Sequence, residues 1–193
     1  MTSWIKYTAI ALVPGALLAL GGVLGCSSDV QSESSALPPQ TAGQPAAKNP
    51  ARSATAVPDF VLQDLSGNTV RLSDFAGKAV FINFWATWCP PCKAELPDLV
   101  EVQSEFGGDD FVIVGISLDQ IGPAAVQAFV QKAGLNFPIL MGNQEVVDAY
   151  GSFRGIPTSF LLNASHEEVR RYTGMITKKQ LVRDLQGILE GSA

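Results

Sequence analysis

Two cysteines, Cys89 and Cys92, lie where an apolar run of strand character is followed by a segment of helical character. Across the first turn of a helix, cysteines at positions i and i+3 can meet disulfide geometry, with Cα atoms about 5–6 Å apart. A helix N-terminus also stabilises the thiolate, which is the nucleophilic form of cysteine. Pro90 and Pro91 suit this turn because its N–H groups have no helical partner. The spacing therefore predicts reversible thiol–disulfide chemistry.

Two other interpretations of the cysteine pair are a permanent staple and a pair of metal ligands. A disulfide that closes only two residues constrains the unfolded chain little. A closed zinc site needs four ligands, and the chain adds only Cys26 and one histidine, His166, in a polar turn. We therefore expect no resident metal and no cofactor.

The charge composition indicates which classes of binding partner to expect. The 193 residues carry a formal net charge of −5, and basic residues run together only as the pairs Arg170-Arg171 and Lys178-Lys179. Without a basic patch, no nucleic-acid partner is expected. Three cysteines are too few for a disulfide scaffold.

The N-terminal residues 1–25 have the character of an export signal. Lys6 precedes an uncharged stretch whose prolines and glycines weaken it as a permanent membrane helix. Val23-Leu24-Gly25-Cys26 resembles the bacterial lipobox, which implies a lipid on Cys26. Cleavage without a lipid, or an uncleaved anchor of about 19 residues, are the alternatives. All three place the domain outside the cytoplasm.

Residues 26–57 form the predicted linker to a single domain over residues 58–193. Ser, Ala, Gln and Pro dominate the linker, and it shows no apolar periodicity. Burial there cannot offset the entropy cost of ordering the chain. The linker would let a tethered domain reach partners near a membrane surface.

Apolar runs and turn residues predict an α/β domain in which strands alternate with helices. We expect strands at 59–62, 69–72, 79–84, 111–118, 137–140, 158–162 and 167–172. We expect helices at 92–106, 123–133, 145–150 and 177–190, the last capped by Thr177. Pro97 either kinks the first helix or begins a second, short one.

The segment Trp88-Cys89-Pro90-Pro91-Cys92 after a strand resembles the thioredoxin superfamily. Together with Phe84 to Thr87 it is similar to the membrane-tethered TlpA/ResA/CcmG group, and the match runs from about Val57 to the C-terminus. This resemblance implies a thioredoxin fold with an N-terminal β-hairpin, a central βαβ-type insertion over 111–140, and helices on both faces of a mixed sheet.

The resemblance also implies a substrate-binding surface beside the cysteines. Pro157 matches the cis-proline of thioredoxin-like folds, with Ile156 as the residue before it. Backbone there can pair with an extended substrate segment, and Trp88 offers an apolar contact. An ordinary trans turn proline is the alternative for Pro157.

Asn83 stands where thioredoxin has a buried carboxylate that moves the proton of the resolving cysteine. ResA-like proteins use an acidic residue of the insertion instead, and that position aligns with Asp119 or Gln120. Only Asp119 can carry a proton, and we expect burial and a neighbouring thiolate to raise its pKa. The alternative is that Asp119 caps the next helix or faces water.

The leading hypothesis is a lipid-anchored extracytoplasmic thiol–disulfide oxidoreductase, with Cys89 as nucleophile and Cys92 as resolving thiol. By resemblance it reduces protein disulfides, for example in apocytochrome c or in copper-site assembly. Its electrons would come from a membrane thiol donor of the CcdA/DsbD type. A peroxiredoxin-like peroxidase is a second hypothesis, although Ala86 stands where those enzymes need threonine. A Cu(I) metallochaperone with two thiolate ligands is a third.

Overall fold

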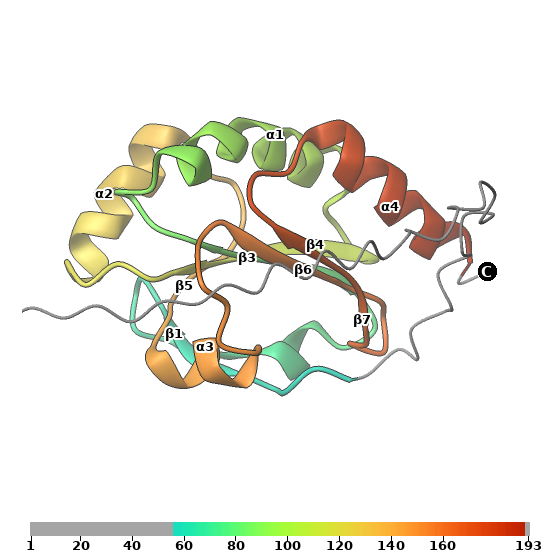
Figure 1. Ribbon diagram of the computed structural model, residues 1–193, viewed down its shortest axis with the longest axis horizontal. Helices are drawn as coiled ribbons and strands as arrows, with labels where there is room; N and C mark the ends of the chain where they lie inside the picture. Colours follow the sequence, from blue (N-terminus) through green and yellow to red (C-terminus); the bar gives the residue numbers. More distant parts are fainter. Residues whose placement is uncertain (1–55, 192–193) are drawn as a thin grey trace, which may run out of the picture. The chain divides into compact units, whose positions relative to one another are not determined.

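A computed structural model describes residues 56–191. The expected signal segment, Cys26 and nearly all of the linker lie outside these residues. Seven strands form one sheet in the order β2-β1-β5-β4-β3-β6-β7 (Figure 1). The strands are β1 (Val61–Asp64), β2 (Thr69–Arg71), β3 (Ala79–Trp85), β4 (Phe111–Ser117), β5 (Ile139–Met141), β6 (Thr158–Leu162) and β7 (Glu168–Thr173).

Helices cover both faces of this sheet, as predicted. The helices are α1 (Pro90–Phe106), α2 (Pro123–Ala133), α3 (Gln144–Ala149) and α4 (Lys178–Glu190), with a 3₁₀ turn η1 (Leu72–Phe75). Helices α1, α2 and α4 share one apolar cluster with the sheet, whereas α3 and η1 share the other. Figure 1 shows the two layers on opposite sides of β3 and β6.

Strand β3 lies in the interior of the sheet, and every one of its residues is buried. Its side chains alternate between the two faces of the sheet. Phe81 and Trp85 pack into the cluster under α1 and α4, whereas Ile82 and Phe84 pack into the cluster above α3. Strand β3 pairs parallel with β4 and antiparallel with β6. The cysteines follow the carboxyl end of β3, which lies between β4 and β6.

The N-terminal hairpin and the central insertion are both confirmed. Strands β1 and β2 pair antiparallel, and β4-α2-β5 forms a parallel crossover. The fifth strand begins at Ile139 rather than at residue 137, because Pro138 has no N–H to give to a neighbouring strand. Pro97 lies inside one continuous α1, so the alternative of a second helix is wrong.

No helix within residues 56–191 is long and apolar enough to cross a membrane.

Candidate active site

Cys89 and Cys92 form a disulfide at the N-terminus of α1, with their Cα atoms 5.3 Å apart. Cys89 is the N-cap residue of this helix, and the Cys92 N–H donates to its Sγ at 3.3 Å. Pro90 and Pro91 occupy the first helical turn, as the sequence predicts. Both cysteines are buried. A protein that reacts with Cys89 therefore has to dock on the residues that surround its sulfur.

The loop before β6 forms one side of that surface. The Ile156–Pro157 peptide bond is cis, as the resemblance predicts. The Ile156 carbonyl oxygen lies 3.7 Å from the Cys89 Sγ. The Gly174 N–H donates to the Pro157 carbonyl oxygen at 2.9 Å, which joins the loop between β7 and α4 to the same surface. The structure thus brings Ile156 and Pro157 to the disulfide from 67 residues away in the chain.

Trp88 forms another side of the surface. Its side chain is 63 % exposed, although it directly precedes the buried Cys89. Trp88 and Ile156 both line a groove of about 370 Å³ that begins beside the disulfide. An exposed tryptophan next to a reactive sulfur can contact a protein that docks there.

Glu95 is a buried acidic residue that the sequence analysis did not identify. It follows Cys92 by three positions on α1, and only 1 % of its surface is exposed. The Asn83 Nδ2 donates to its Oε1 at 2.8 Å, and the Ile176 N–H donates to its Oε2 at 2.9 Å. Burial raises the pKa of Glu95 to about 7, and these two hydrogen bonds oppose that rise. Glu95 therefore exchanges a proton near neutral pH.

Asn83 joins Glu95 to β6. Its Nδ2 donates to the Ser159 Oγ at 2.9 Å as well as to Glu95, whereas its Oδ1 is buried without a hydrogen-bond partner. With its amide turned over, Asn83 would accept a hydrogen bond through Oδ1 from protonated Glu95, so it can serve both protonation states of the carboxyl group. A signal for Glu95 existed in the sequence, since residues 92, 95, 96 and 99 follow helical spacing on one face of α1.

Asp119 lies in the loop after β4, and its side chain is also buried, at 4 % exposure. Thr87 donates to it twice, through its N–H at 2.9 Å and its Oγ1 at 2.6 Å. The Ser117 Oγ donates to the same carboxylate at 2.8 Å. Asp119 thus holds the turn that precedes Trp88 and Cys89.

The predicted proton-carrying role of Asp119 stays a prediction, but both of its simpler alternatives are wrong. Helix α2 has Gly122 as its N-cap, with no side-chain cap bond, so Asp119 does not cap it. Its burial excludes the second alternative, a side chain that faces water. Among residues 56–191, the hydrogen bonds of Asp119 go to Thr87 and Ser117, and none joins it to a cysteine. Gln120 lines the groove beside Trp88 instead.

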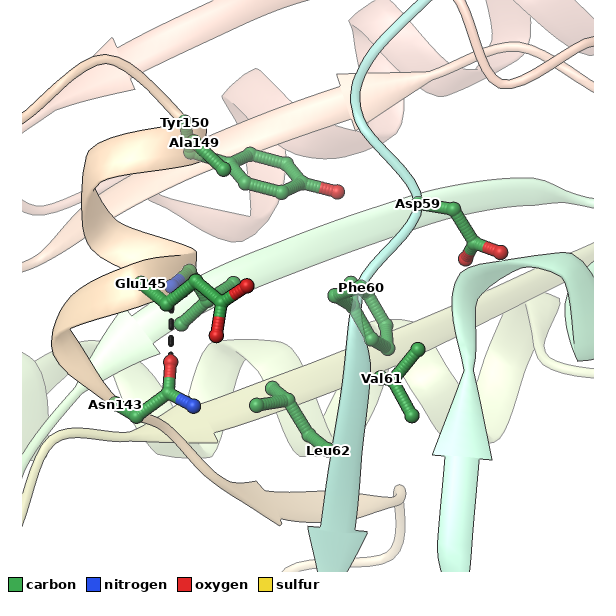
Figure 2. Close-up of a pocket in the computed structure, with 9 residues that line it drawn as sticks. Asp59, Phe60, Val61, Leu62, Asn143, Glu145, Ala149 and Tyr150 are labelled. Carbon is green, nitrogen blue, oxygen red and sulfur yellow. Dashed lines mark hydrogen bonds between the residues drawn. The ribbon is translucent and has the colours of Figure 1, made fainter.

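A second cavity, of about 160 Å³, lies between β1 and α3 (Figure 2). Two acidic residues line it, Asp59 and Glu145, and Asp59 already accepts hydrogen bonds from the N–H and the Oγ of Ser73. Asn143 caps α3 through the Val146 N–H, and the Tyr150 hydroxyl donates to the Pro58 carbonyl oxygen. No cysteine lines this cavity, and the Tyr150–Pro58 hydrogen bond joins the segment before β1 to the end of α3.

The part of the chain that the structure describes contains no group of three or more His, Cys, Asp or Glu side chains that could hold a metal ion.

Comparisons with known proteins agree with this site. Residues 54–184 match the AhpC/TSA family. The thiol-disulfide oxidoreductase ResA of Geobacillus kaustophilus is 39 % identical over 132 residues, which cover 68 % of this chain and 75 % of the relative. ResA of Bacillus subtilis is 36 % identical over 134 residues, covering 69 % and 73 %.

A solved structure has the same fold. The thiol:disulfide interchange protein of Chlorobium tepidum TLS, a thioredoxin family protein, matches with a TM-score of 0.66 and 31 % identity. The match covers 72 % of this chain and 98 % of that one. The chain therefore belongs to the AhpC/TSA family and is a thioredoxin-fold protein similar to the ResA-type thiol–disulfide oxidoreductases.

Proposed function

We propose that this thiol–disulfide oxidoreductase reduces disulfides of other proteins outside the cytoplasm, with Cys89 as the attacking thiolate. The observation that carries the proposal is the Cys89–Cys92 disulfide at a helix N-terminus, beside the Ile156–Pro157 loop and the exposed Trp88. This arrangement places a nucleophilic sulfur where a docked polypeptide can reach it.

The reaction conserves electrons between two disulfides. In the reduced protein, the Cys89 thiolate attacks one sulfur of a substrate disulfide and forms a mixed disulfide, and the other substrate sulfur leaves as a thiolate. Cys92 then loses its proton and attacks the Cys89 Sγ, which releases the second substrate thiolate. The substrate gains two electrons and two protons, and the protein is left with the Cys89–Cys92 disulfide.

Glu95 is the group we assign to the proton of Cys92. It lies one helical turn beyond Cys92 on the buried face of α1, and a pKa of about 7 lets it accept and return a proton near neutral pH. Asp119 is the rival candidate, as the resemblance implies. The three hydrogen bonds to Asp119 favour a positioning role for that residue.

The surroundings of Cys89 support a reducing protein rather than a strong oxidant. Strong oxidants stabilise the thiolate of the first cysteine heavily. Here, the sulfur of Cys89 receives a backbone N–H from Cys92, and neither Pro90 nor Pro91 has one to offer. With this single backbone donor, we expect the reduced form to be stabilised less than in strong oxidants, which favours electron flow from this protein to its substrates.

The resemblance and the N-terminal sequence supply the cellular setting of the proposal. The lipobox-like Val23–Cys26 segment supports export and a lipid anchor on Cys26. A membrane thiol donor of the CcdA/DsbD type would return the Cys89–Cys92 disulfide to thiols after each turnover. Apocytochrome c and proteins that assemble copper sites are the substrate classes that the resemblance favours.

Trapping of the mixed disulfide tests the proposal. Full-length protein with Cys92→Ala, expressed in the source cell, should accumulate partners bound through a disulfide to Cys89. These partners should separate when a reductant is added. The matched control is Cys89→Ala with Cys92 intact, which should trap far fewer partners because Cys92 is fully buried. Absence of any reducible adduct in Cys92→Ala would refute the exchange mechanism.

A further inference from the structure

The groove beside the disulfide combines an apolar part with one charged group. Of the described residues that line it, Arg154 alone is charged. The apolar part consists of side chains from four separate segments: Trp88, Leu118, Val147, Phe153 and Ile156. The volume of about 370 Å³ lies in the range of about 300–1,000 Å³ typical of binding pockets. The groove is thus large enough for side chains of a docked segment.

Arg154 differs from the three arginines of β7 and α4, all of which have acidic partners. Arg170 and Arg183 both pair with Asp184, and Arg171 pairs with Glu168. No hydrogen bond or ion pair joins Arg154 to another residue within 56–191. The nearest acidic residue in sequence, Asp148, already accepts hydrogen bonds from Gln144 and Ser152. The guanidinium of Arg154 therefore keeps its donors for an external acceptor, and a carboxylate matches their geometry best.

The position of the groove relates this charge to the redox reaction. Trp88 directly precedes Cys89, and Ile156 contacts the Cys89 Sγ through its carbonyl oxygen. A substrate cysteine that bonds to Cys89 must therefore place its neighbouring residues in or along the groove. Tryptophan and arginine are also the residue types that contribute most to binding at protein interfaces.

We propose that the groove selects an acidic substrate segment, with a bulky apolar side chain against Trp88 and Phe153 and a carboxylate at Arg154. The occupant is an extended stretch of the substrate protein, on either side of its disulfide cysteine. This inference rests on the proposed function, because it assigns specificity to the same exchange reaction. It makes Arg154 a specificity residue that takes no part in the bond exchange itself.

The test uses three cyclic disulfide peptides that differ only in charge. Each has leucine next to the target cysteine, and the positions beyond carry glutamate, glutamine or lysine on both sides, so the binding direction does not matter. The second-order rate constant for oxidation of the reduced protein is measured by stopped flow. The wild type should favour glutamate over lysine by roughly threefold to tenfold, as expected for exposed charge pairs. The preference should fade as the ionic strength rises toward about 1 M.

Variants with altered charge test whether the preference for the glutamate peptide depends on Arg154. Arg154→Gln should react with all three peptides at similar rates, and Arg154→Glu should favour the lysine peptide. Lys132→Gln on α2 removes one positive charge outside the groove and should keep the wild-type order. The proposal is overturned if Arg154→Gln keeps the wild-type order, or if Lys93→Gln, beside the disulfide but outside the groove lining, abolishes it equally.

A second arm tests the apolar part of the groove. Replacing the leucine of the peptide by glycine should slow the wild type severalfold and should slow Trp88→Ala much less. Equal slowing in both proteins would contradict this part. The outcomes also separate the two proposals: a wild type that reduces no peptide refutes the exchange function, whereas equal rates for all peptides refute only the selection by charge.

Discussion

Two buried carboxyl groups, Glu95 and Asp119, are associated with the redox turn, the segment from Thr87 to Cys92, and their surroundings differ. Glu95 lies on the buried face of α1 and receives two hydrogen bonds, from Asn83 and Ile176. Asp119 receives three, two of them from Thr87 in the redox turn itself. Both side chains are at most 4 % exposed.

From this difference we expect burial alone to be a poor guide to which carboxyl group carries protons. Desolvation disfavours the charged form, and each donated hydrogen bond favours it. For Glu95, desolvation is the larger effect and the pKa rises to about 7. A carboxylate with three donors, two from one residue, is arranged as a fixed acceptor that holds backbone in place. We therefore expect variants of the two residues to fail in different ways.

The largest effect is expected from Glu95→Gln on turnover. The glutamine cannot accept the proton of Cys92, so resolution of the mixed disulfide should slow by about 10²–10⁴. The inflection of the rate near pH 7 should disappear at the same time. Rapid-mixing kinetics with a disulfide peptide, recorded across the pH range, measures both effects.

The matched control for this variant is Glu101→Gln, which makes the same chemical change at an exposed position of α1. It should keep the wild-type rate and the wild-type pH profile. A rate of Glu95→Gln within threefold of the wild type would assign the proton to another group.

The second largest effect is on the free energy of unfolding, and it also arises from Glu95. The pKa is about 7 in the folded protein against 4.5 for the unfolded reference, so the folded state holds the proton more strongly. This contribution is fully present below about pH 4.5 and is lost as the pH rises through about 7. The loss amounts to roughly 3 kcal/mol.

Denaturant unfolding of the oxidised protein at several pH values measures this contribution. Glu95→Gln should be more stable than the wild type at pH 8 and nearly equal to it at pH 4, since the turned Asn83 amide can still accept a hydrogen bond. Parallel pH profiles of wild type and variant would show that Glu95 does not titrate in this range.

The smallest effect is expected from Asp119→Asn. One oxygen becomes a donor that faces Thr87 or Ser117, so the free energy of unfolding should fall by about 1–3 kcal/mol. Turnover should fall less than tenfold, because we assign the proton of Cys92 to Glu95. Thr87→Val is the control that removes one of the same hydrogen bonds and keeps the carboxylate, and it should reproduce part of the loss.

A different result would exchange the roles of the two carboxyl groups. A drop of about 10² or more in Asp119→Asn, with Thr87→Val unaffected, would give the proton to Asp119 as the resemblance implies. The thiolate titration of the cysteines would then shift downward in Asp119→Asn, because a neighbouring negative charge is removed.

Most of the fold could be predicted from local sequence. The buried strands β3 and β4 are continuous apolar runs, and the glycine at the C-cap of α2 has the left-handed conformation that ends helices. Strand ends were less certain, as Pro138 shows, because pairing depends on which N–H groups a neighbour can use. The cysteine pair and Pro157 could be identified because few other structural or chemical roles require these residue types at these positions.

Glu95 escaped prediction because its role depends on distant chain segments. An acidic residue near the start of a helix ordinarily faces water and stabilises the helix N-terminus. Its burial here depends on the Ile176 N–H, which is 81 residues away. Arg154 was not predicted for a related reason. A surface arginine becomes a candidate binding residue only through the groove beside it, which several separate segments of the chain form.

The described chain enters the domain at the end of the sheet that lies far from the disulfide. The Val57 N–H donates to the His166 carbonyl oxygen, in the turn between β6 and β7. In the β3–β6 pair, Leu162 lies opposite Val80 and Thr158 lies opposite Phe84, so this turn is at the far end of the sheet from the disulfide. About 20 Å of strand separates the two ends. The described chain therefore enters the domain at the end of the sheet opposite the disulfide, so Val57 does not obstruct the surface around Cys89.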